Sequence, residues 1–162
     1  GGPHDHMTAA KAVAFEEALQ PEFKEYAKQV VKNAKVLAEE LVNYGFEIVS
    51  GGTDNHLMLI NTMSKGCPGK DAEKALEKAG ISCNKNMVPF DARSPFDPSG
   101  IRIGTPAITT RGMKEAEMRT LAGWINEVLS DVSNVAVQEK VLKEVHELCK
   151  HFPVPGIEVI ED

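Results

Sequence analysis

The sequence lacks the features that would tie it to a membrane, to nucleic acid or to an oxidising compartment. No apolar run approaches the roughly 20 residues of a transmembrane helix, and no secretory signal pattern stands at the start. No run of basic residues occurs, and the formal net charge is -6, so nucleic acid is not an expected partner. The three cysteines are odd in number and show no CxxC spacing. They predict free thiols in a reducing compartment, and therefore a cytoplasmic protein without a membrane partner.

Short signatures of several enzyme classes are absent as well. We find no phosphate-binding GxGxxG or GxxxxGKS/T motif, no local signature of a Ser-His-Asp or Cys-His nucleophile, and no internal repeat. The cluster His4-Asp5-His6 has no second ligand pair of comparable spacing, so we interpret it as a polar lead-in and expect no metal site. The chain begins Gly1-Gly2-Pro3 without an initiator methionine, and we expect it to be a piece of a longer protein.

What is present is typical of one globular domain, with 42% hydrophobic and 26% charged residues over 162 positions. Helical spacing of apolar residues predicts helices, and short alternating or apolar runs predict strands. We expect helices over 7–20, 21–44, 69–79, 113–129 and 135–152, strands over 46–49, 56–61, 81–84 and 101–103, and a polar turn over 108–112. The run 56–61 is apolar enough to predict cover on both faces. The order predicts an α+β fold: a small, mostly antiparallel sheet covered by helices on one side.

One arginine stands out, because Arg102 lies between Ile101 and Ile103, with Gly100 and Gly104 outside them. Strand alternation places the two isoleucines on a buried face and Arg102 on the opposite face. A guanidinium at a strand end suits bidentate binding of a carboxylate or phosphate. A structural salt bridge to Asp or Glu is the alternative, and for a single arginine the more common one.

The segment 85–99 directly precedes this strand and contains Pro89, Pro95 and Pro98 with little periodicity. A loop of this length in a compact domain is usually functional or disordered. Its continuity with the Arg102 strand favours function.

Several longer motifs together resemble the C-terminal part of serine hydroxymethyltransferase, from residue 1 to about residue 130 and more weakly to residue 153. The segments that carry the resemblance are Gly1-Gly2-Pro3 with His6, 9–14, 21–26, 29–34, 49–57, 84–86, 89–91, Arg93-Ser94-Pro95-Phe96, 99–107 and 110–113. The resemblance implies a pyridoxal-phosphate enzyme of the aspartate-aminotransferase fold (fold type I), a homodimer or tetramer. Such an enzyme moves a one-carbon unit between serine and tetrahydrofolate, giving glycine and 5,10-methylenetetrahydrofolate.

The resemblance also implies roles for particular residues. Arg102 matches the residue that binds the amino-acid carboxylate, and Asn86 matches the asparagine that contacts the pterin ring. Ser94, Pro95 and Phe96 match a segment that contacts folate. Gly2 matches a residue whose backbone contacts the cofactor phosphate of a neighbouring subunit. For Arg102 this reverses the preference for a salt bridge.

By the same resemblance, three functional residues would lie upstream of Gly1 and are missing. They are the lysine that anchors pyridoxal phosphate, the aspartate that pairs with its pyridine nitrogen and the histidine that stacks on its ring. We therefore expect no catalytic residue in this chain and no turnover by it alone. Residues 1–20 are expected to lead out of a missing large domain, 21–153 to form the small domain, and 154–162 to be an acidic, flexible tail. The alternatives are another fold-type I pyridoxal-phosphate enzyme, such as an aminotransferase, and a non-catalytic ligand-binding module.

Overall fold

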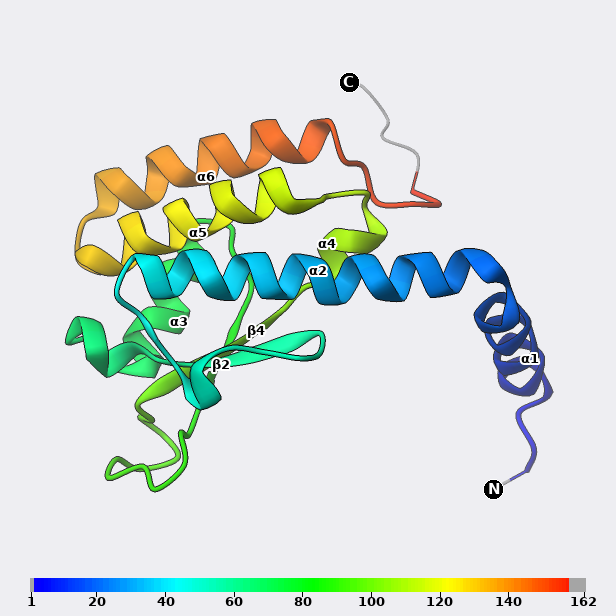
Figure 1. Ribbon diagram of the computed structural model, residues 1–162, viewed down its shortest axis with the longest axis horizontal. Coiled ribbons are helices and arrows are strands. Elements are labelled where there is room, and N and C mark those ends of the chain that lie inside the picture. The colour runs from blue at the N-terminus through cyan, green and yellow to red at the C-terminus, as the bar shows by residue number, and fades with distance from the viewer. Residues whose placement is uncertain (1, 158–162) are drawn as a thin grey trace.

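The computed structural model describes residues 2–157, which form a small sheet beneath layers of helices (Figure 1). In chain order the elements are α1 (Asp5–Leu19), α2 (Pro21–Asn43), β1 (Glu47–Ile48), a 3-10 turn η1 (Val49–Gly51), β2 (Leu57–Asn61), a 3-10 turn η2 (Thr62–Lys65), α3 (Gly69–Lys78), β3 (Asn84–Asn86), β4 (Gly100–Gly104), α4 (Pro106–Thr110), α5 (Glu115–Ser130) and α6 (Val135–Lys150).

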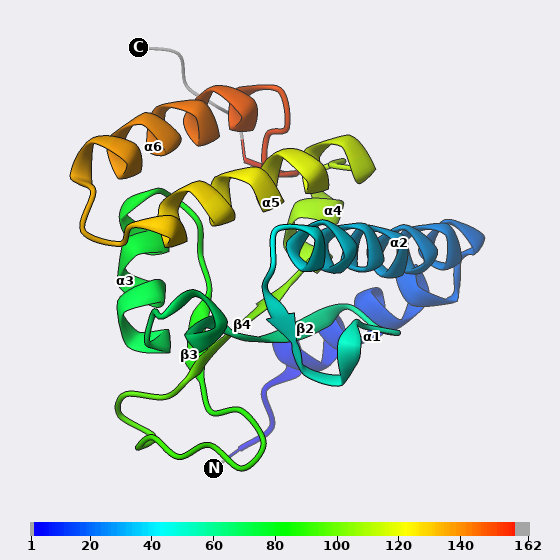
Figure 2. The same ribbon diagram turned by 60° about the vertical axis from the view of Figure 1, so that its left-hand side comes forward.

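The sheet has four strands in the order β1-β2-β4-β3, and every neighbouring pair is antiparallel. Helices α2 and α3 pack on one face of this sheet, α5 packs on both of those helices, and α6 packs on α3 and α5. Figures 1 and 2 show the helices on the same side of the strands from two directions. The α+β fold with a small antiparallel sheet, expected from the sequence, is confirmed.

The two faces of the sheet differ in cover. Met58 and Ile60 of β2 are buried beneath the helices, whereas Leu57 and Leu59 on the opposite face are only half-buried. The prediction that 56–61 is covered on both faces is therefore wrong for this chain, because the helices pack on one face only within residues 2–157. The open face is the one on which β4 places Arg102.

The hydrophobic core lies between the covered face of the sheet and the helices. Its most deeply buried large side chains are Leu37, Leu41, Met58, Ile60, Leu76, Ile101, Met118, Ile125, Val128, Leu129 and Val141. Most of them lie on α2, α5 and α6, where apolar residues recur at helical spacing. The three cysteines are free, as predicted.

Two local predictions need correction. The expected polar turn over 108–112 is largely the short helix α4, whose first residue Pro106 suits the start of a helix because its missing N–H has no helical partner there. The strand expected over 81–84 lies instead over Asn84–Asn86, because Ile81 is buried in the core and the pairing with β4 begins at Asn84.

Helix α1 stands apart from the core and has no buried residue. It lies across the start of α2, at the end of α2 remote from α3 (Figure 1). Met7, Val13, Phe15 and Leu19 are all exposed. Helix α1 therefore buries none of its side chains against the rest of residues 2–157. In that same part of the chain no helix combines the length and apolarity needed to cross a bilayer.

Candidate functional site

The site is built on β4, the third strand in the sheet order. Ile101 and Ile103 point into the core, with 0% and 7% of their surface exposed, and Arg102 is exposed on the open face. The alternation therefore presents the guanidinium as the sequence predicted. Because both neighbours are anchored in the core, the backbone at Arg102 has a fixed position.

The glycines that flank this strand are explained by close contact with β2 and the residue before it. A Cβ on Gly100 would lie 2.5 Å from the carbonyl oxygen of Ile60, and a Cβ on Gly104 would lie 2.9 Å from that of His56. Neither distance leaves room for a side chain, since both partners are backbone atoms. The two glycines let β2 approach both ends of β4, so they fix the spacing between the two strands on either side of Arg102.

Arg102 lines an open hollow of about 430 Å³ on this face. The other residues around the hollow are His56, Leu57, Ser82, Cys83, Asn84, Ile103 and Gly104. The Nε–H of Arg102 donates a hydrogen bond to Oδ1 of Asn84 at 3.1 Å. Across residues 2–157, no carboxylate forms an ion pair with Arg102. The structural salt bridge considered from the sequence is thus not formed there.

The cysteine in the hollow is not a nucleophile in this state. Burial, followed by the nearby carboxylates of Glu73 and Glu77, raises the pKa of the Cys83 thiol to about 12. The thiol therefore stays protonated near neutral pH. The permanent charge in the lining is that of Arg102, so the arrangement can bind an anion but offers no activated nucleophile.

Asn86 lies on the same face of the sheet as Arg102. Asn84 is the register partner of Arg102 and Asn86 that of Gly100, so Asn84, Asn86 and Arg102 all point to the open side. Alternate residues of a strand are about 7 Å apart, so Asn86 stands one step along the face from Asn84. The sequence expectation that Asn86 belongs to the same site as Arg102 is compatible with this placement.

The loop between β3 and β4 is held together by one carboxylate. Asp91 accepts hydrogen bonds from the hydroxyl of Ser99 at 2.6 Å, from the N–H of Ser99 at 2.9 Å, from the N–H of Arg93 at 2.9 Å and from the N–H of Val88 at 3.2 Å. These donors, the Ser99 hydroxyl first, hold the pKa of Asp91 well below its ordinary value. These hydrogen bonds therefore give the loop a defined conformation.

Ser94, Pro95 and Phe96 are exposed within this loop and do not line the Arg102 hollow. Phe96 is 84% exposed, and Phe90 in the same loop is fully exposed. Arg93 pairs with Asp97 and bonds its carbonyl oxygen at 3.0 Å, which closes the turn beneath Ser94 and Pro95. The structure thus presents the segment to the outside without bringing it to Arg102.

Gly2 is exposed ahead of α1 and has no atom within 4 Å of a Cβ built on it. It does not line the Arg102 hollow either. His4 and His6 have their rings 5.8 Å apart, and within residues 2–157 no three His, Cys, Asp or Glu residues are grouped to bind a metal.

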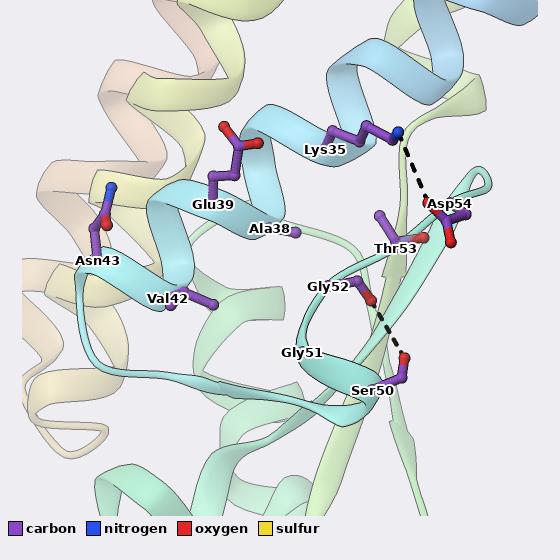
Figure 3. A pocket seen from close by; sticks show the side chains of 10 residues that line it. All are labelled: Lys35, Ala38, Glu39, Val42, Asn43, Ser50, Gly51, Gly52, Thr53 and Asp54. Atoms are coloured by element: carbon purple, nitrogen blue, oxygen red, sulfur yellow. Dashed lines mark hydrogen bonds and ion pairs between the residues drawn. The ribbon is translucent and has the colours of Figure 1, made fainter.

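A second hollow, of about 530 Å³, lies between α2 and residues 50–54 (Figure 3). Lys35 points across it towards Asp54, with 3.7 Å between Nζ and Oδ1, and Glu39 adds a second carboxylate. Ser50 and Gly51 have positive φ angles of 65° and 74°, which makes this segment a tight turn. The one lysine of this hollow already faces a carboxylate, whereas Arg102 faces none within residues 2–157, so we take the Arg102 hollow as the candidate site.

Sequence reasoning assigned no role to Asn84. The available signal was the pattern Asn84-Lys85-Asn86, since two asparagines separated by one residue share a face in a strand. Which strand they pair with, and therefore that Asn84 bonds Arg102, depends on the register of β3 against β4.

Comparison with known proteins gives a consistent result along the chain. The family model for serine hydroxymethyltransferase matches residues 1–125. Serine hydroxymethyltransferase of Acidothermus cellulolyticus is 58% identical over 164 residues, covering 98% of this chain and 38% of that relative. Serine hydroxymethyltransferase 1 of Pseudomonas fluorescens is 56% identical over 156 residues, covering 96% of this chain and 37% of that relative. The chain thus spans less than two fifths of the length of these relatives.

Proposed function

The chain belongs to the serine hydroxymethyltransferase family, and from that premise we propose that it supplies the small C-terminal domain of an enzyme that transfers a one-carbon unit between serine and tetrahydrofolate. The products would be glycine and 5,10-methylenetetrahydrofolate. Within that enzyme, the task of this chain is to bind the amino-acid carboxylate through Arg102. By itself the chain is expected to be inactive.

The observation that carries the proposal is the state of Arg102. Its guanidinium is exposed in a hollow, bonded through Nε to a neutral amide and not paired with an acid within residues 2–157. An exposed arginine on a rigid strand can take a carboxylate in a bidentate manner. Holding the carboxylate at a fixed point orients the bonds at the substrate Cα, which is a positioning effect.

The family name implies pyridoxal phosphate, and the hollow tests how much of that cofactor's site this chain could provide. None of the residues that line it is a lysine, so the hollow supplies no covalent anchor. When bound, the cofactor would supply an electron-withdrawing ring next to the substrate Cα. The contribution of this chain is the carboxylate grip and, at Gly2, an exposed backbone that an anionic phosphate could approach closely.

Tetrahydrofolate would reach the site from the side of the β3–β4 loop. Asn86 shares the open face with Arg102, and its amide could hydrogen-bond a pterin ring. The exposed segment Ser94-Pro95-Phe96 would make further contacts to the folate. The bonds of Asp91 support this proposal, because they hold the loop in shape before any ligand arrives.

The uncovered surface of α1 supports a partner for this part of the chain. Its apolar side chains, together with Phe23 at the start of α2, are exposed. We assign this surface to the large domain of the enzyme or to a second subunit of a cytoplasmic homodimer or tetramer, because apolar side chains left exposed along a whole helix favour burial against a partner.

The test is kinetic and uses a full-length serine hydroxymethyltransferase that carries this sequence. Arg102→Ala should raise the KM for serine by about a hundredfold or more, and Arg102→Lys by about tenfold to a hundredfold, because lysine lacks the planar fork. Arg119→Ala is the matched control, since Arg119 lies on α5 and pairs with Glu40 at the surface. A normal KM in Arg102→Ala would overturn the proposed role.

The two alternatives make different predictions. An autonomous ligand-binding module would bind serine or a folate analogue tightly as the isolated chain, whereas the proposed domain needs the rest of the enzyme. Calorimetric titration of the isolated chain separates these cases. An aminotransferase would depend on Arg102 but not on Asn86, so folate-independent activity of the full-length enzyme would favour it.

A further inference from the structure

Arg102 and Asn84 face each other across the two paired strands β4 and β3. They are direct register partners in an antiparallel pair, in which side chains opposite each other have Cβ atoms about 5 Å apart. The short amide of Asn84 reaches only the near end of the arginine, and its Oδ1 accepts from Nε–H at 3.1 Å. The bond therefore touches the guanidinium at the nitrogen closest to its stem.

The orientation of the Asn84 amide follows from its second hydrogen bond. Nδ2 donates to the carbonyl oxygen of Lys85 at 2.9 Å, which leaves the amide oxygen turned towards Arg102. Lys85 is in turn tied to α3, because its N–H donates to Glu73 Oε1 at 2.9 Å and its Nζ to Glu73 Oε2 at 3.1 Å. A continuous set of contacts thus runs from Glu73 on α3 to the guanidinium.

A guanidinium has five N–H groups, of which one is on Nε and four are on the two terminal nitrogens. Since Asn84 accepts from Nε, the group cannot turn that edge to a ligand without breaking the bond. We propose that Asn84 is a positioning residue that directs the two terminal nitrogens of Arg102 at the carboxylate of the amino-acid substrate. This rests on the proposed function, because it concerns how Arg102 performs it. Without Asn84 the side chain of Arg102 would lose conformational entropy each time a substrate binds, and this cost weakens the binding of the substrate.

The experiment uses the full-length enzyme described above. Asn84→Ala should raise the KM for serine by roughly fivefold to tenfold, the effect of losing one solvent-exposed hydrogen bond, and change kcat by less than about twofold. Asn43→Ala is the matched control, because Asn43 is an exposed asparagine at the end of α2 that does not line the Arg102 hollow. It should leave the KM unchanged.

Two further variants separate positioning from general support of the fold. The Arg102→Lys variant has no Nε–H, so adding Asn84→Ala to it should raise the KM for serine no further. If Asn84 only supported the fold, Asn84→Ala would raise the KM by the same factor in both backgrounds. Asn84→His places an imidazole nitrogen near the position of Oδ1. While neutral that nitrogen can accept, so the KM should be near normal around pH 8. The KM should rise as the pH falls through about 6, because both nitrogens of the protonated imidazole are donors and neither can accept the Nε–H of Arg102.

The outcomes distinguish this inference from the proposed function. If Arg102→Ala leaves the serine KM unchanged, the proposed function fails. If Arg102→Ala raises the KM but Asn84→Ala does not, the grip on the carboxylate stands and the positioning role of Asn84 is wrong. An additive effect of Asn84→Ala on Arg102→Lys, or an Asn84→His enzyme defective at every pH, would overturn the positioning role as well.

Discussion

The carboxylate of Asp91 accepts two hydrogen bonds from Ser99, one from the hydroxyl at 2.6 Å and one from the backbone N–H at 2.9 Å. Ser99 immediately precedes β4, the strand of Arg102, and Asp91 lies near the middle of the loop that enters it. The pair therefore connects the shape of the proposed folate-facing loop to the strand that carries the carboxylate grip.

Acid should loosen this loop. The pKa of Asp91 is lowered because the carboxylate accepts hydrogen bonds from Ser99, and a lowered folded pKa means that its stabilising effect is complete above the ordinary value near 4 and is lost below it. We expect the carboxyl signal of Asp91 in a carbon-detected NMR titration to stay constant from pH 7 to pH 4, with loop resonances shifting only in stronger acid. A carboxyl that titrates near pH 4 would contradict the bonding.

Removing the charge should have the same effect at neutral pH. Asp91→Asn replaces one acceptor oxygen by a donor that faces N–H groups, so chymotrypsin should cut after the exposed Phe90 or Phe96 about tenfold faster. Asp97→Asn in the same loop is the control, because it removes only a surface ion pair with Arg93 and should change the rate by less than about twofold. Equal rates in both variants would show that Asp91 does not organise the loop.

A buried asparagine joins α2 to α4 and to the segment that leads into α5. Asn33 is fully buried, and its Nδ2 donates to Thr109 Oγ1 and to the carbonyl of Met113, both at 2.9 Å. Asn33→Ala leaves these acceptors unpaired and opens a cavity, so the free energy of unfolding should fall by about 2–4 kcal/mol in urea denaturation. The same change at exposed Asn43 should stay within about 0.5 kcal/mol. A loss at Asn33 no larger than at Asn43 would argue against the network.

The glycine that begins β4 should not tolerate a side chain. A Cβ on Gly100 would meet the carbonyl oxygen of Ile60 at 2.5 Å, so Gly100→Ala should lower the free energy of unfolding by about 2 kcal/mol or more. In Gly123→Ala the new methyl meets only the Tyr44 hydroxyl at 3.6 Å, inside helix α5. That variant should gain about 0.5–1 kcal/mol from helix propensity. Thermal unfolding of both proteins checks the opposite signs, and a tolerated Gly100→Ala would refute the close contact.

The presentation of Arg102 could be read from the sequence because it depends on a local rule. Isoleucines on both sides of one arginine have a single sensible arrangement in a strand with one buried face, and the structure has that arrangement. The same rule did not place Asn84 beside Arg102, because the partner across a sheet depends on register. Register is decided by the packing of whole strands on α2 and α3.

Helix α4 was missed for a related reason. Thr109 and Thr110 have low helix propensity, and their hydroxyls here bond the carbonyls of Thr105 and Pro106 at 2.7 and 2.9 Å. Asn33 of α2 then holds Thr109 in place from outside the segment. In α1, alanines and other apolar residues lie on all sides of the helix. They form no apolar stripe, so the surface through which α1 packs could not be predicted.

The most direct test of the central claim is a crystal structure of the full-length enzyme with glycine or serine bound. We predict both carboxylate oxygens within about 2.7–3.1 Å of the terminal nitrogens of Arg102, with Nε still bonded to Asn84. A substrate carboxylate held by another residue, with Arg102 turned away or paired with an acid, would contradict the account.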